Sequence, residues 1–289
     1  MKLATIRVNG ATRAVRAEGT VLIDLGAADL GEFLSAPDWP QRAAAATAGP
    51  GKATYPVTGA DFAPLVPAPS KVICVGLNYR NHIQEMGGTL PEYPTLFAKF
   101  PDSLLGARDD LLKPAETDKW DWEVELAIVI GRPARRVKGA DAAAAIAGFT
   151  VLNDVSARDW QTRTSEFLQG KMWDRSTPVG PYLVTPDELP GATAPALRLQ
   201  TVVDGAVMQD DSTADLLFGP VALVEYISTV IRLNPGDIIA TGTPGGVGAG
   251  RKPPRFLVGG ELLATRIEGI GELANRVIKE VVKEKDAAP

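Results

Sequence analysis

Trp122-Glu123-Val124-Glu125-Leu126-Ala127-Ile128-Val129-Ile130-Gly131 is an apolar stretch that carries two glutamates two positions apart. Its Val- and Ile-rich run predicts a buried β-strand. Residues i and i+2 of a strand point to the same face, so the two carboxylates are expected about 7 Å apart. Burying two like charges together is costly unless a cation lies between them. The stretch therefore predicts either a cation site or, if one glutamate faces solvent, a half-exposed strand with a salt bridge.

A third acid lies in a similar setting, because Asp154 follows the strand-like run Phe149-Thr150-Val151-Leu152-Asn153. The chain has one His and one Cys, so the nitrogen and sulfur ligands that zinc prefers are scarce. Three carboxylates on β-rich segments are oxygen donors of the kind that hard divalent cations select. The pattern favours Mg²⁺, Mn²⁺ or Ca²⁺ over zinc.

Length and composition describe an ordinary globular chain. It has 289 residues, 45% of them hydrophobic, and a formal net charge of −5, which argues against a general affinity for nucleic acid. One cysteine excludes an intramolecular disulfide and fits a reducing compartment. The N-terminus is typical of a strand rather than a signal peptide, and no run of about 20 apolar residues predicts a membrane span. We therefore expect a cytoplasmic location, with neither nucleic acid nor membrane as a partner.

Two domains are predicted, 1–67 and 68–289. The first alternates short strands and helices, and the proline-spaced segment 63–69 marks the boundary. Beyond it strand-like runs recur, and only 141–147 and 214–230 have clear helical patterns. Strands that outnumber helices in this way indicate a β-rich α+β barrel or roll rather than a doubly wound sheet.

His82, the single histidine, lies three residues before Glu85. In a helical segment these side chains share a face, so Glu85 could orient the imidazole as a general base. The alternative is a surface histidine on a polar loop. Lys171, among Gly, Trp and Pro residues, could serve a carbonyl or enolate oxygen, or it could be a solvated loop lysine.

A strand runs into a glycine-rich turn between residues 236 and 248. Such a turn can present backbone N–H groups to an anion, but a tight β-bend is the simpler explanation of the glycines. No Gly-Lys-Ser/Thr follows and no helix opens here, so phosphate-loop and dinucleotide fingerprints are poor matches.

Taken together, these segments resemble the fumarylacetoacetate hydrolase family. Six pieces occur in family order across about residues 70 to 275: Val75-Gly76-Leu77-Asn78-Tyr79 with His82 and Glu85, Phe97-Ala98-Lys99-Phe100-Pro101, Asp121 to Leu126, Asn153 to Asp159, Gly170-Lys171 with Pro178 to Pro181, and Gly236-Asp237 through Thr241 to Pro244. The resemblance implies the family's mixed β-roll or barrel catalytic domain, a small N-terminal domain and a homodimer.

The resemblance also implies residue roles. Glu123, Glu125 and Asp154 match metal carboxylates that hold Mg²⁺ or Mn²⁺. His82 and Glu85 match a water-activating dyad, and Lys171 matches the lysine beside the metal. Four residues match substrate-binding positions of the family, namely Tyr79, Arg158, Gln161 and Thr243. Arg158 also matches an arginine that supports the metal carboxylates structurally. Some members of the family carry a basic residue at the position of Leu77, where it contacts the substrate carboxylate. In this chain Arg80, Arg163 or Arg175 could make that contact instead.

The function implied is metal-dependent hydrolysis of a C–C bond in a small acylpyruvate or diketo acid. In this scheme His82 deprotonates water, and the metal and Lys171 stabilise the pyruvate enolate that leaves. The alternatives use the same enolate chemistry for decarboxylation of a 2-oxo acid, or for hydration or isomerisation of an oxo-enoate. A homologue that binds a metabolite without catalysis is the candidate from another class.

Overall fold

This computed structural model describes residues 1–49, 51, 53–85 and 87–281, apart from the side chains of residues 82, 84 and 85. Among the described residues, the largest sheet has 12 strands. Its main path runs in the order β4 (Thr54–Pro56), β3 (Val21–Asp24), β2 (Ala11–Glu18), β1 (Lys2–Val8), β14 (Thr177–Val184), β12 (Ile146–Asn153), β11 (Val124–Ile130), β17 (Ile238–Ala240), β6 (Val72–Gly76) and β7 (Thr95–Lys99). Two strands branch from this path, β5 (Asp61–Phe62) beside β1 and β8 (Leu104–Leu105) beside β14.

Two smaller sheets and six short α-helices complete the described chain. One sheet runs in the order β16 (Ala206–Ser212), β15 (Arg198–Val203), β18 (Leu262–Ile267), β19 (Gly271–Lys279) and β9 (Leu111–Lys113), and the other pairs β10 (Trp120–Asp121) with β13 (Ser156–Ala157). The helices are α1 (Leu30–Ser35), α2 (Trp39–Ala45), α3 (Arg80–Glu85), α4 (Gly139–Ala144), α5 (Arg158–Gln161) and α6 (Pro220–Val230). The predicted β-rich α+β fold is confirmed.

Strand β11, which the opening stretch predicts, is buried on both faces. All seven of its residues are buried, and it pairs antiparallel with β12 and with β17. Its even-numbered residues belong to one hydrophobic cluster, while Ala127 and Val129 belong to a second that includes Phe33 and Trp39 of the N-terminal helices. Apolar burial worth about 1.5–3 kcal/mol for each large side chain therefore fixes this strand's position.

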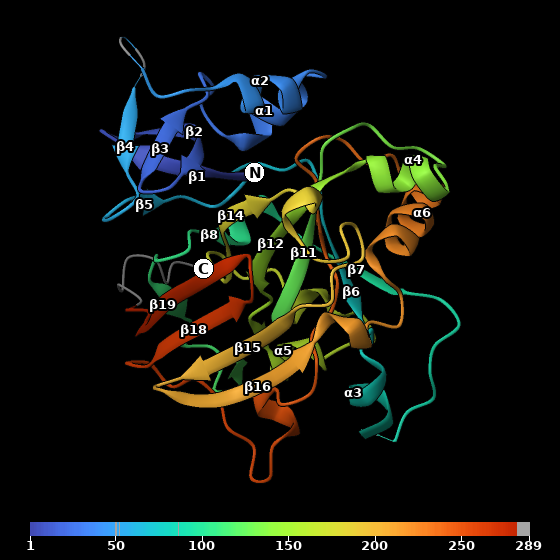
Figure 1. The fold of residues 1–289 in the computed structure, drawn as a ribbon. Coiled ribbons are helices and arrows are strands. Elements are labelled where there is room, and N and C mark those ends of the chain that lie inside the picture. Colours follow the sequence, from blue (N-terminus) through green and yellow to red (C-terminus); the bar gives the residue numbers. More distant parts are fainter. Residues whose placement is uncertain (50, 52, 86, 282–289) are drawn as a thin grey trace, which may run out of the picture.

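The first 67 residues join the large sheet directly. Strand β1 pairs with β14, with Lys2 opposite Val184, and the Trp39 indole donates to the carbonyl of Gly131 at 3.1 Å. Figure 1 shows these N-terminal strands and α1 and α2 together at one end of the molecule, next to β14. The domain boundary at residue 67 stays a prediction, although the two parts share one sheet.

The two helices predicted beyond residue 68 are shorter than their sequence patterns. Helix α4 ends at Ala144, because Ile146 pairs with Ile130 at the start of β12. Tertiary pairing thus overrides the helical preference of alanine. Only the second part of 214–230 forms α6. In the described part of the chain, no helix has the length and apolar character needed to cross a membrane.

Candidate metal centre

Glu123, Glu125 and Asp154 meet at one end of β11. Antiparallel pairing sets Val124 opposite Asn153, and the Asp154 N–H donates to the carbonyl of Glu123 at 2.9 Å. All three side chains are buried, and one carboxylate oxygen from each lies within 4.8 Å of the others. Three converging carboxylates form an all-oxygen donor set, which suits a hard divalent cation.

Glu125 is the carboxylate whose surroundings most favour a cation. Its Oε2 accepts a hydrogen bond from the Gly242 N–H at 2.7 Å. In the part of the chain that the structure describes, no lysine or arginine forms an ion pair with it. Burial, followed by the charges of Asp154 and Glu123, raises the pKa of Glu125 well above its ordinary 4.5. A divalent cation would remove that repulsion, so the residues fit the metal.

Each carboxylate oxygen of Asp154 forms an ion pair with a different lysine. The Lys171 ammonium lies 2.8 Å from Oδ2 and 2.7 Å from Glu123 Oε2, and Lys99 lies 2.6 Å from Oδ1. Burial by itself would raise the pKa of Asp154, but the charges of Lys171 and Lys99 outweigh it and lower that pKa to about 2. Burial likewise works against the charge of Lys171, yet Asp154 and Glu123 raise its pKa. Lys171 is 2% exposed, which excludes a solvated loop lysine.

Arg158, the first residue of α5, links Glu123 to two other side chains. Its Nη1 lies 2.6 Å from Glu123 Oε1 and donates to Gln161 Oε1 at 3.0 Å, and its Nε donates to Asp121 Oδ2 at 2.8 Å. Burial disfavours the guanidinium charge, but Glu123 and Asp121 outweigh this and raise its pKa. Arg158 therefore stays cationic and fixes the orientation of Glu123.

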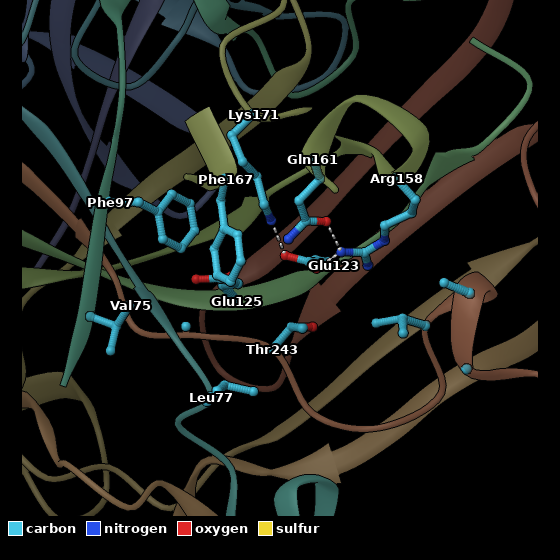
Figure 2. A pocket seen from close by; sticks show the side chains of 14 residues that line it. Val75, Leu77, Phe97, Glu123, Glu125, Arg158, Gln161, Phe167, Lys171 and Thr243 are labelled. Carbon is cyan, nitrogen blue, oxygen red and sulfur yellow. Dashed lines mark hydrogen bonds and ion pairs between the residues drawn. The ribbon is translucent and has the colours of Figure 1, made fainter. Parts of the chain in front are cut away.

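Of these residues, Glu123, Glu125, Arg158, Gln161 and Lys171 line a cavity of about 250 Å³. Figure 2 shows Lys171, Arg158 and Gln161 around Glu123, with Phe97 and Phe167 beside Lys171. The remaining lining residues include Val75, Leu77, Glu125, Thr243, Val247 and Ala249. The lining therefore combines cationic and carboxylate side chains with apolar ones such as Val75, Leu77 and Phe97. This combination suits a small, partly apolar anion.

The structure brings most of the predicted site residues together. Thr243 lines the cavity and accepts a hydrogen bond from Gln209 Nε2 at 2.8 Å. Tyr79 is fully buried outside the lining, and among the described residues its hydroxyl has no hydrogen-bond partner. The dyad lies on α3, but the side chains of His82 and Glu85 fall outside the described residues. The catalytic and substrate-binding roles of these residues stay predictions.

The three arginines considered as replacements for a basic residue at position 77 are engaged elsewhere. Arg80 donates to backbone carbonyls of residues 215–217, and Arg163 stacks on Trp160 with its guanidinium 3.4 Å from the ring centre. Arg175 is exposed, with its guanidinium 4.0 Å from Asp109. Leu77 itself lines the cavity, so this part of the wall is apolar.

Sequence reasoning missed Lys99 and Asp121, although both lie in motif segments. Lys99 ends β7 with its side chain fully buried against Asp154, 55 residues away. The available signal is a lysine at the end of an apolar strand-like run, where a charge has to find a partner. In the glycine-rich turn, the Gly242 N–H donates a hydrogen bond to the carboxylate of Glu125.

Comparisons with known proteins give consistent matches. Residues 71–278 match the model for the fumarylacetoacetate (FAA) hydrolase C-terminal domain. The chain is 44% identical over 214 residues to the mitochondrial oxaloacetate tautomerase Fahd2a of Rattus norvegicus, covering 74% of this chain and 68% of that protein.

Two solved structures match over nearly the whole chain. One is a fumarylacetoacetate hydrolase from psychrophilic Exiguobacterium antarcticum, with 33% identity and a TM-score of 0.85, covering 97% of this chain and 100% of that one. The other is a 5-carboxymethyl-2-hydroxymuconate delta-isomerase from Mycobacterium smegmatis, with 33% identity, a TM-score of 0.77 and the same coverage. Their names cover hydrolysis and isomerisation.

Proposed function

From the premise that this chain belongs to the fumarylacetoacetate hydrolase family, we propose that it is a divalent-metal-dependent isomerase of a small 2-oxo acid. The reaction interconverts keto and enol forms, with an oxaloacetate-like dicarboxylate as the substrate class. The observation that carries the proposal is the Lys171 ammonium, held 2.7–2.8 Å from Glu123 and Asp154 in the wall of the cavity.

The relatives support isomerisation better than the C–C hydrolysis expected from the motifs. One relative is named a tautomerase and one structural neighbour an isomerase. Hydrolysis of an acylpyruvate is the second candidate, because the Exiguobacterium antarcticum neighbour is named a hydrolase. Both reactions pass through an enolate, so the same cations serve either outcome.

The residues that line the cavity have distinct tasks in this reaction. A cation held by Glu123, Glu125 and Asp154, Mg²⁺ or Mn²⁺ by the chemistry of the donors, would supply Lewis-acid polarisation of the 2-oxo group. Lys171 donates a hydrogen bond to the developing enolate oxygen, and its raised pKa keeps it protonated. Arg158 and Gln161 orient polar substrate groups, while Phe97 and Phe167 restrict water. His82 is the proposed base for the carbon-bound proton.

The experiment follows enol-oxaloacetate by its ultraviolet absorbance with Mg²⁺, with EDTA and in Glu125→Gln. We expect the catalysed rate to fall more than about 100-fold on metal removal or in the variant, because the donor that most needs a cation is lost. Asp237→Asn changes a buried acid outside the cavity lining and serves as the control.

Parallel assays with acylpyruvates and mass detection of products decide between the two candidates. Pyruvate release without any effect on enol-oxaloacetate would establish the hydrolase instead. Turnover that is equal in EDTA and in Glu125→Gln would contradict metal dependence altogether.

A homodimer and a cytoplasmic location complete the proposal, with neither nucleic acid nor a membrane as partner. The net charge of −5 supports the exclusion of nucleic acid. The rat relative, by contrast, is named as a mitochondrial protein.

A further inference from the structure

Asp121 is a fully buried carboxylate that accepts four hydrogen bonds. Its Oδ1 accepts from the N–H groups of Trp122 and Gly248 at 2.9 and 2.6 Å. Its Oδ2 accepts from Arg158 Nε at 2.8 Å and from the Ala249 N–H at 3.0 Å. Both oxygens are therefore occupied, with one bond from the next residue and three from two distant segments of the chain.

One side of this arrangement leads to the metal carboxylates. Arg158 uses its Nε for Asp121 and its Nη1 for Glu123 Oε1, at 2.6 Å, and for Gln161. Because the guanidinium is planar and rigid, fixing its Nε edge also fixes the Nη1 edge. Asp121 thereby helps to position Glu123, which Lys171 also contacts at 2.7 Å, although Asp121 does not itself line the cavity.

The other side leads to the wall of the cavity. Val247, Ala249 and Gly250 line it, and Asp121 holds the turn that contains them through two backbone N–H groups. The turn approaches its surroundings closely, because a Cβ at Gly248 would lie 1.9 Å from the Arg255 carbonyl oxygen and 2.6 Å from Asp121 Oδ1. The wall is thus held against Asp121 with no room for a side chain at residue 248.

We infer that Asp121 is a positioning residue that couples the metal ligand Glu123 to the wall of the substrate cavity. The inference rests on the proposed function for the identity of the two ligands. It predicts that loss of Asp121 weakens metal binding and anion binding together, since one carboxylate supports both. Partners that support metal ligands in this way typically contribute about 10- to 100-fold in metal affinity.

The test compares Asp121→Ala with Asp237→Ala in the full-length protein. Asp237 is an equally buried acid with four partners, namely Ser70 Oγ, the Lys71 N–H and ammonium, and the Asn234 N–H, and none of these residues lines the cavity. Calorimetry measures the Kd of Mn²⁺ and then the Kd of oxalate, an enolate mimic, at saturating Mn²⁺. We expect Asp121→Ala to raise both values about 10- to 100-fold, and Asp237→Ala to leave both within about two-fold.

Four results would overturn the inference. A folded Asp121→Ala that changes only one affinity removes the coupling, and equal effects of both variants indicate general loss of stability. If circular dichroism shows that Asp121→Ala is unfolded, Asp121→Asn is tested in its place. In either amide orientation, the new NH₂ group faces the N–H of Gly248 or of Ala249 and cannot accept its hydrogen bond. An unchanged oxalate affinity in Asp121→Asn then overturns the inference. A wild-type protein that binds no Mn²⁺ contradicts the proposed function, and the coupling with it.

Discussion

Asp154 and Glu125 are both fully buried acids of one site, yet they have opposite electrostatic surroundings. Asp154 lies between two ammonium groups, whereas Glu125 faces two carboxylates and a backbone N–H. Lys99 makes much of this difference, because it is fully buried and lies 2.6 Å from Asp154. A buried charge whose partner is removed is far more costly than an exposed one.

We predict that Lys99→Met lowers the free energy of unfolding of the metal-free protein by about 3 kcal/mol. The substitution keeps the apolar stem and leaves Asp154 with Lys171 alone. Added Mg²⁺ should recover part of the loss, because it supplies positive charge to the same carboxylates. Urea denaturation with and without Mg²⁺ measures both effects.

Lys71→Met is the matched control. Its ammonium lies 2.7 Å from Asp237, but the lysine side chain is 18% exposed and Asp237 keeps three other donors. We expect a loss of about 1 kcal/mol or less. Equal losses in the free energy of unfolding of the two variants would show that the buried Lys99–Asp154 pair contributes no more than the partly exposed Lys71–Asp237 pair.

Among the elements, the glycine-rich turn after β17 contacts the candidate metal site. Gly242 has φ +98°, and its N–H donates to Glu125 at 2.7 Å. The sequence pattern was compatible with an anion-facing turn or, more simply, a tight β-bend, and the Gly242 N–H does donate to an anion. The anion is a carboxylate of the protein's own β11, brought there because Thr241 N–H bonds to the Leu126 carbonyl.

We predict that Gly242→Ala lowers the free energy of unfolding by more than about 1 kcal/mol. It should also weaken Mn²⁺ binding about 10-fold, because the donor that orients Glu125 shifts. The new Cβ would lie 2.9 Å from the Val75 carbonyl oxygen, so the backbone has to move. Denaturation and Mn²⁺ calorimetry measure the two effects.

Gly260→Ala separates these causes. Gly260 has φ +109° but open space around its Cβ position, so its alanine variant carries the backbone strain without the close contact. Its Mn²⁺ affinity should match the wild type. If both variants lose the same stability and neither changes metal binding, the turn has no role at the metal site.

At the scale of the whole molecule, an ion pair between Arg7 and Asp109 links the N-terminal strands to the rest of the chain. Arg7 of β1 donates both Nη1 and Nη2 to Asp109, at 2.9 and 2.8 Å. Burial raises the pKa of Asp109, but the hydrogen bonds from Arg7 and Gly106 outweigh it and keep the pKa below its ordinary 3.8. A lowered carboxyl pKa contributes stability above pH 3.8, and that contribution is lost as pH falls through the folded-state value.

We predict that Asp109→Asn destabilises the protein by about 1–2 kcal/mol at pH 7, in the range for a partly exposed, charge-assisted pair. The difference from wild type should begin to shrink as pH falls below 3.8, where the unfolded chain takes up the proton, and should vanish below the lower pKa of Asp109 in the folded protein. Urea denaturation across this pH range measures it. Asp38→Asn is the control, because Asp38 is exposed and its side chain makes no cap hydrogen bond to α2. A pH-independent difference for Asp109→Asn would contradict the assignment.

The sequence by itself determined the family, the β-rich fold and the three acids of the candidate metal site. Family membership and fold agree with the motif-based predictions. This succeeded because a strand's side-chain period and its burial are local properties, visible in ten residues around Glu123 and Glu125.

Only the tertiary structure decided which side chains surround those acids. Lys99 contacts Asp154, 55 residues away, and Asp121 accepts a hydrogen bond from the Gly248 N–H, 127 residues away. Tyr79 is buried outside the cavity lining. Such partners depend on the register and crossing of distant strands, which local patterns do not encode. A buried charge has to be paired, but packing over the whole chain selects its partner.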